Sequence, residues 1–95
     1  MWESYKKGFK AYLRLERSLS ENSVVAYLDD VDKLARFSED QLTKKSPESI
    51  SLKDLEQFVK WIVELGLAPY SQARIISGIK AFFRYLELDD VIKDD

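Results

Sequence analysis

The sequence predicts an all-α fold, a compact four-helix bundle-like domain, and three observations support that prediction. Apolar residues recur at three- and four-residue spacing along nearly the whole chain, and no window alternates as a half-buried strand would. Glycine and proline are scarce, with three and two residues. The 95 residues, 45% of them hydrophobic, suffice for one domain with its own core.

The first two helices are expected over about residues 2–17 and 20–38. Ser20 is a good N-cap for the second helix, because its hydroxyl can accept a backbone N–H of the first turn. Residues 39–50 read as a polar connection that contains Pro47. The expected inward residues are Phe9, Tyr12 and Leu13 in the first helix, and Val24, Leu28, Val31 and Ala35, flanked by Tyr27 and Leu34, in the second.

The third and fourth helices have clear start signals. Ser51 is the expected N-cap of the third, Asp54 stands at the capping-box spacing, and Gly66 stands where a helix ends in a left-handed residue. The fourth starts at Pro69, which suits a first helical position, and runs to about Leu86. The expected buried residues are Leu52, Leu55, Phe58, Val59, Ile62 and Leu65, then Ile75, Ile76, Ile79, Phe82, Phe83 and Leu86.

Composition excludes several kinds of chemistry. The chain has no cysteine and no histidine, so it offers no disulfide, no thiolate nucleophile and no imidazole base or ligand. It has no glycine-rich phosphate loop, no nucleophile elbow and no metal-ligand cluster. No apolar run is long enough to span a bilayer, and no signal peptide is evident. We expect no catalysis by these residues alone, no cofactor, no metal and a cytoplasmic location.

Charge is distributed unevenly along this chain of net charge -2. Residues 1–17 contain five basic and two acidic residues, residues 68–86 contain three basic and none acidic, and residues 87–95 sum to -4. If the fold brings the two basic segments together, they form a basic face, as nucleic-acid binding requires. The alternative is a solvated surface of uneven charge.

The fourth helix has a second, polar face opposite its apolar arc. A solvated helix usually mixes Glu with Lys, but this face contains no carboxylate. Gly78 lies on it, although a glycine inside a helix costs about 1 kcal/mol relative to alanine. Either a ligand approaches this face closely or Gly78 packs against another helix. The face consists of Tyr70, Ser71, Arg74, Ser77, Gly78, Ala81 and Arg84, with Lys80 on its flank.

Two segments resemble a known family. The first is the run ERSLSENS from Glu16 to Ser23, with Tyr27 after it, and the second is the pattern S-x-x-R-x-x-S-x-x-K-x-F-F-R-Y-L over residues 71–86. In this order they resemble the N-terminal core-binding, or SAM-like, domain of tyrosine recombinases and phage integrases. The Xer-type chromosome-dimer resolvases are the nearest match. The resemblance covers about residues 2–90.

The resemblance implies the DNA-gripping part of a site-specific recombinase, acting in DNA integration or chromosome-dimer resolution. In that family this domain holds one side of duplex DNA, and a C-terminal domain cuts and rejoins strands. Residues 1–88 would be the core-binding domain, and residues 89–95 the start of a linker to a catalytic domain absent from this chain. Duplex DNA at the recombination site would be the partner, with other subunits joining in a synaptic tetramer of the full-length protein. No membrane is implied, and the isolated domain is expected to be monomeric.

The resemblance also implies which residues bind DNA. Arg74 is favoured as a DNA contact over a surface residue, and because it points away from the apolar arc, Arg74→Ala should leave folding nearly intact. Capping alone would equally explain Ser20 and Ser23, and the ring of Tyr27 suits the core with a solvated hydroxyl. Ala68 departs from the serine that many relatives have there. The candidate DNA-binding residues are Ser20, Asn22, Ser23, Tyr27, Tyr70, Ser71, Arg74, Ser77, Lys80 and Arg84.

Two further expectations concern geometry and an alternative function. The second and fourth helices should lie near each other, with residues 20–23 and 71–84 on one surface, because their apolar arcs share one small core. The alternative function is a helical protein–protein interaction module without a nucleic-acid role, using an apolar groove or exposed Trp2 and Trp61 as its contact surface.

Overall fold

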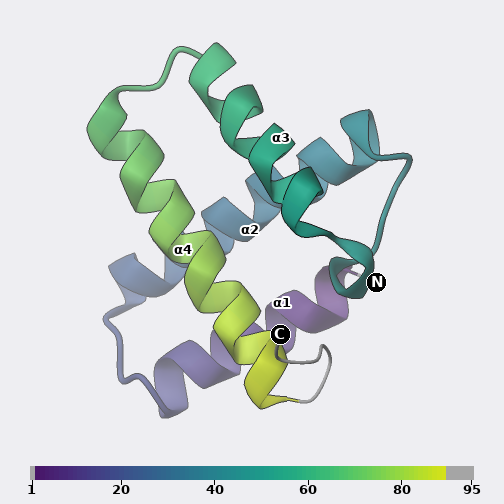
Figure 1. Ribbon diagram of the computed structural model, residues 1–95. Helices are drawn as coiled ribbons and strands as arrows, with labels where there is room; N and C mark the ends of the chain where they lie inside the picture. The colour runs from purple at the N-terminus through teal and green to yellow at the C-terminus, as the bar shows by residue number, and fades with distance from the viewer. Residues whose placement is uncertain (1, 90–95) are drawn as a thin grey trace.

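The computed structural model describes residues 2–89, and these residues form an all-helical domain without strands (Figure 1). The all-α prediction and the order of its four helices are therefore confirmed. Positions 90–95 of the expected linker lie outside the described residues. The elements are α1 (Trp2–Leu15), α2 (Glu21–Gln41), the 3₁₀ helix η1 (Pro47–Ser49), α3 (Leu52–Glu64) and α4 (Pro69–Leu88).

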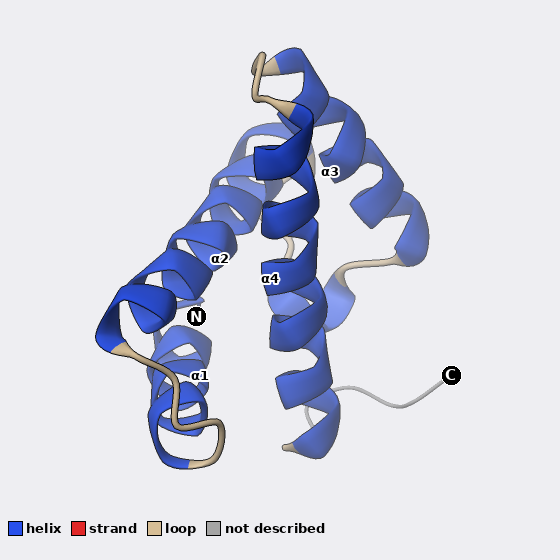
Figure 2. Ribbon diagram, turned by 90° about the vertical axis from the view of Figure 1, so that its left-hand side faces the viewer, coloured by secondary structure: helices blue, strands red, loops and turns tan. Residues whose placement is uncertain are grey.

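Helix α4 is the central element of the domain. In Figure 2 it lies between α2 and α3, and α1 lies near its C-terminal half. Its most extensive packing is against α2, which also packs against α1. The expected proximity of the second and fourth helices is thus confirmed.

The core has two apolar clusters, which meet where α2 and α4 cross. One joins the second half of α2 to α3 and the first half of α4; the other joins α1 to the first half of α2 and the end of α4. Burying this apolar surface on both sides of α4 is the main force that holds the helices together. The first cluster contains Leu34, Phe37, Leu42, Phe58, Ile62, Ile75 and Ile79, and the second contains Phe9, Leu13, Val24, Val31, Phe82 and Leu86.

Helix starts follow the capping chemistry of the sequence. The Ser20 hydroxyl accepts the backbone N–H of Ser23 at 3.3 Å. At α3 both halves of a capping box are present: Ser51 Oγ accepts the Asp54 N–H at 3.1 Å, and an Asp54 carboxylate oxygen accepts the Ser51 N–H at 2.9 Å. Gly66 has a φ of +80°, the left-handed conformation expected after α3.

The segment expected as a polar connection is more ordered than its composition indicates. Helix α2 continues to Gln41, and the following Leu42 and Pro47 are buried. The backbone carbonyl of Lys45 accepts two hydrogen bonds, from Trp2 Nε1 at 3.2 Å and from Ser38 Oγ at 2.6 Å. These contacts attach the connection to α1 and α2, which the charge-rich sequence did not reveal. Helix α1, in contrast, ends at Leu15 rather than near residue 17.

Several expectations about burial were wrong. Of the expected α3 core residues, Phe58 and Ile62 are buried, but Leu52, Val59 and Leu65 are exposed. Because α3 lies at the edge of the domain, only one side of its wide apolar stripe meets α2 and α4 (Figure 1). The two tryptophans are not exposed contact residues either, because both pack against the core.

Helix α4 starts without a side-chain cap, since Ala68 occupies the N-cap position. We expect Ala68→Ser to raise the free energy of unfolding by about 0.5–1 kcal/mol, because a serine hydroxyl can accept an otherwise unpaired N–H of the first turn. Urea denaturation of the two proteins measures the difference. Ser51→Ala is the matched reverse change and should lower stability by about 1 kcal/mol. No gain from Ala68→Ser would contradict the capping argument.

Candidate nucleic-acid interface

A polar hollow of about 340 Å³ lies between the start of α2 and the first half of α4. It brings together residues that are about 50 positions apart in the sequence, so residues 20–23 and the polar stripe of α4 do share one surface. Its lining combines hydroxyls, an amide and a guanidinium and includes no carboxylate. The lining residues are Asn22, Ser23, Ala26, Tyr27, Arg74 and Ser77.

The N-terminus of α2 supplies one wall of this hollow. The first backbone N–H groups of a helix have no intrahelical partner, and the helix dipole makes this end partly positive. The Ser20 hydroxyl accepts one of these N–H groups, from Ser23. Asn22 and Ser23 both lie in the first turn and are exposed. This wall therefore has the chemistry of an anion site.

Arg74 supplies the opposite wall and forms an ion pair across the helix interface. Its Nη2 donates to Oδ1 of Asp30 on α2. The Asp30 side chain is fully buried, whereas the Arg74 side chain is 36% exposed. A guanidinium has five N–H donors. The pair therefore uses one edge of the Arg74 guanidinium, and the residue also lines the hollow.

Gly78 leaves the space that the Asp30 carboxylate occupies. It follows Arg74 by four residues, so both face α2 from the same side of α4. A Cβ at position 78 would overlap Asp30 Oδ2. Of the two explanations for this glycine, packing against another helix is therefore correct.

The buried carboxylate is incompletely satisfied. Asp30 Oδ2 is buried and has no hydrogen-bond partner within residues 2–89. Burial raises the pKa of Asp30 from 3.8 to about 6, and the attraction and hydrogen bond of Arg74 oppose that rise without cancelling it. At neutral pH the carboxylate is charged, but its ionisation costs folding free energy.

The polar face of α4 has an exposed part and a half-buried part. Tyr70, Ser77, Lys80 and Arg84 are exposed, with Tyr70 at 81%, whereas Ser71 and Arg74 are half-buried. The expectation that Arg74 simply points away from the core was wrong, because Arg74 pairs with the buried Asp30. We therefore now expect its removal to affect folding. The sequence did not reveal its buried partner, because Asp29 and Asp30 are adjacent and their burial depends on how α2 packs. Arg84 lies 3.9 Å from Glu87 and remains largely solvated.

The basic residues of α1 do not join those of α4 in one hollow. Lys6, Lys7 and Lys10 line a separate hollow with Leu28 of α2. Some α1 cations are also paired: Lys6 lies 2.5 Å from Asp32, and Arg14 lies 2.5 Å from Glu21. These two α1 cations are therefore partly neutralised, and the hollow between α2 and α4 has Arg74 as its lining cation.

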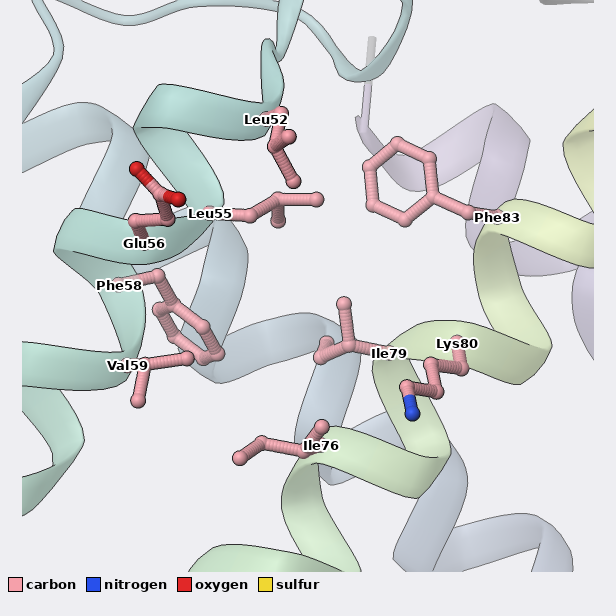
Figure 3. Close-up of a pocket in the computed structure, with 9 residues that line it drawn as sticks. All are labelled: Leu52, Leu55, Glu56, Phe58, Val59, Ile76, Ile79, Lys80 and Phe83. Atoms are coloured by element: carbon pink, nitrogen blue, oxygen red, sulfur yellow. The ribbon is translucent and has the colours of Figure 1, made fainter. Parts of the chain in front are cut away.

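An apolar groove of about 260 Å³ lies on the other side of α4, against α3. In Figure 3 the side chains of Leu52 and Leu55 point from α3 toward Phe83 of α4. Leu52 is 75% exposed, and Lys80 lies at the groove margin. Four of the six α3 residues that the sequence placed in the core line this groove: Leu52, Leu55, Phe58 and Val59.

Residues 2–89 contain no cluster of three or more acidic, histidine or cysteine side chains placed to hold a metal ion. No helix in this part of the chain is long and apolar enough to cross a membrane.

Comparison with known proteins identifies the family. Residues 7–89 match the family model described as the phage integrase, N-terminal SAM-like domain. The chain belongs to this family. The resemblance of the two motifs is thereby confirmed, and the SAM-like domain accounts for nearly all described residues.

The curated relatives of this SAM-like domain are tyrosine recombinases. It is 32% identical over 84 residues to tyrosine recombinase XerC of Pediococcus pentosaceus, with 88% of this chain and 28% of that protein covered. It is 34% identical over 80 residues to tyrosine recombinase XerD of Vibrio cholerae, with 84% of this chain and 26% of that protein covered. It is 37% identical over 79 residues to tyrosine recombinase XerC of Herpetosiphon aurantiacus, with 83% of this chain and 26% of that protein covered. The chain thus spans little more than a quarter of these relatives. No solved structure matches it significantly.

We expect Arg74→Ala to destabilise the SAM-like domain by about 2–3 kcal/mol, because it leaves a buried carboxylate without the ion-pair partner that it has among residues 2–89. The same change in an Asp30→Leu background should cost less than half as much. Arg84→Ala removes a solvated arginine and should change stability by less than about 0.5 kcal/mol. Urea denaturation measures all three, and equal losses for Arg74→Ala in both backgrounds would show that the pair is not the cause.

Stability should also depend on pH through Asp30. Its folded pKa of about 6 exceeds its ordinary value of 3.8, so protonation stabilises the fold. This contribution is complete below the unfolded pKa and is lost as pH rises through about 6. We expect the unfolding free energy of wild type, relative to Asp30→Asn, to be about 1 kcal/mol greater at pH 5 than at pH 7.5. A difference that grows toward pH 7.5 would contradict the raised pKa.

Proposed function

We propose that this SAM-like domain grips one side of duplex DNA at a recombination site, as the N-terminal part of a site-specific tyrosine recombinase. In this proposal the hollow between α2 and α4 receives the DNA backbone. The exposed residues on the polar face of α4 continue the contact along a groove of the DNA duplex. The candidate contact residues remain those expected from the sequence, with Arg74, Ser77 and Lys80 as the principal ones.

The observation that supports this proposal most strongly is the composition of the polar hollow. A helix N-terminus, hydroxyl and amide groups, and an arginine converge there from α2 and α4. Phosphate oxygens accept hydrogen bonds from all these groups, and the α2 dipole favours a negative charge at this end. The same helix carries two further exposed cations, Lys80 and Arg84.

The proposed binding is weak for the isolated domain. Asp30 offsets much of the charge of Arg74, and Arg84 lies near Glu87. Of the three basic residues on α4, only Lys80 has no ion-pair partner among residues 2–89. We therefore expect a dissociation constant in the range of about 10⁻⁴–10⁻⁶ M at physiological salt. A second DNA-binding domain on a longer chain would raise the effective concentration and tighten binding.

The role proposed for the domain is binding rather than strand cleavage. The sequence contains no histidine, and its tyrosines are better explained by packing and surface positions than by nucleophilic attack. Cleavage, rejoining and assembly of a synaptic tetramer are proposed for a full-length recombinase. A cytoplasmic location is part of the same proposal.

Lys80→Ala tests the DNA-binding proposal without disturbing the core. Lys80 is exposed, so the variant should fold normally, lose affinity for a labelled 20–30 base-pair duplex and reduce the salt slope of log K by about one unit. Fluorescence anisotropy at several salt concentrations measures both quantities.

Lys60→Ala is the matched control. Lys60 is also exposed but lies on α3, away from the polar hollow, so its removal should leave the affinity and the salt slope nearly unchanged. Equal slopes for wild type and Lys80→Ala, or equal effects of the two alanine changes, would contradict the proposed placement of DNA.

The apolar α3–α4 groove supports a second candidate, a protein-binding module. Leu52 in this groove and Val63, also on α3, are both exposed. Exposed apolar side chains of this kind can mark a surface that binds a protein partner. Binding there would depend little on salt, which separates the two candidates. The tryptophans no longer support this alternative, because they belong to the core.

A further inference from the structure

The buried Asp30 carboxylate needs an explanation beyond helix packing. One of its oxygens has no hydrogen-bond partner among residues 2–89, and its space exists only because position 78 is glycine. An incompletely satisfied buried charge is a poor stabiliser, and an apolar side chain of similar shape often serves a core better. Stabilisation of the fold is therefore not a sufficient reason for an aspartate at position 30.

The Asp30–Arg74 ion pair adjoins the polar hollow between α2 and α4. Arg74 is a lining residue of that hollow, together with Asn22, Ser23 and Ser77. Asp30 lies behind it, fully buried, and accepts from one guanidinium nitrogen. A free arginine samples many rotamers, whereas this one is held by a fixed carboxylate on the neighbouring helix.

We propose that Asp30 is a positioning residue for DNA binding, which fixes the Arg74 guanidinium so that its unpaired N–H donors face a phosphate at the N-terminus of α2. This inference rests on the proposed function. Ordering a long side chain before binding removes part of the entropy cost of association. Asp30 does not contact DNA itself, since it is buried behind Arg74.

The effect of removing Asp30 on DNA affinity distinguishes a positioning role from a simple charge effect, because the two predict changes in opposite directions. Removing a carboxylate near a DNA-binding surface should tighten binding if the carboxylate only offsets positive charge. If Asp30 positions Arg74, its removal should weaken binding. Asp30→Asn and Asp30→Leu keep the branched shape of aspartate, and Arg74 can turn to solvent in both variants because it is already 36% exposed.

The experiment titrates wild type, Asp30→Asn, Asp30→Leu and Asp29→Asn against a labelled duplex at low salt, with folding checked by circular dichroism. Both Asp30 variants should lose affinity by about 3- to 10-fold, the size of the ordering cost of one long side chain. Asp29→Asn is the matched control, because it makes the same chemical change at the adjacent, exposed position. It should bind as tightly as wild type or slightly more tightly. Asp30 variants that behave like Asp29→Asn would overturn the proposal.

Double-variant measurements separate positioning from a general change in structure. The Asp30→Asn loss should largely disappear in an Arg74→Lys background, since the guanidinium is then absent. It should persist in full in a Lys80→Ala background. Equal losses in both backgrounds would show that Asp30 acts through the fold as a whole and would overturn the positioning role.

A measurement on the unmodified protein keeps the proposal testable if the Asp30 variants fail to fold. Nitrogen-15 spectra of free wild type should show separate, slowly exchanging Nη signals for Arg74. Averaged signals of a freely rotating guanidinium would overturn the proposal. Absent or salt-insensitive DNA binding by wild type would instead overturn the proposed function, and this inference with it, whereas salt-sensitive binding with unchanged Asp30 variants overturns the inference alone.

Discussion

The ion pair between Asp30 of α2 and Arg74 of α4 is the contact around which the two central helices are arranged. The pair joins the two helices that pack most extensively against each other, and its carboxylate fits there because Gly78 has no side chain. A side chain at position 78 would clash with the Asp30 carboxylate, so the ion pair could not keep its present arrangement. The glycine's intrinsic cost within α4 is thus offset by close packing that no other residue allows.

This crossing also determines what each side of α4 can present. Toward α2 the helix shows a half-buried, polar edge, and toward α3 it shows Ile76 and Phe83 at an apolar groove with Lys80 at its margin (Figure 3). Ser77 and Arg84 are exposed. Because α4 turns 100° per residue, one helix can supply a core arc, a polar hollow and an apolar groove at once. The function of the domain therefore depends on how its neighbours cover α4 as much as on the sequence of α4.

The helices and their caps were predictable because they depend on local chemistry. Ser20, Ser51, Asp54 and Gly66 act as their positions indicate, since capping needs only residues a few places apart. Burial across α3 was not predictable, because an apolar stripe does not reveal how much of its width a neighbour covers. The motifs located the candidate interface correctly on α2 and α4, but the partner of Arg74 lies 44 positions away and follows no short-range rule.

A signal for that partner was nevertheless present in the sequence. Asp30 follows Tyr27 by three residues and precedes Leu34 by four, so it falls on the inward side of α2 rather than on its solvated face. A carboxylate on the buried side of one helix requires a cation or a donor on another, and the helix with a glycine one turn after an arginine is the one that can approach closely enough. Read together, a misplaced acid and an unfavourable glycine identify one contact. Sequence features that weaken two helices separately are thus evidence for an interaction that the pair forms together.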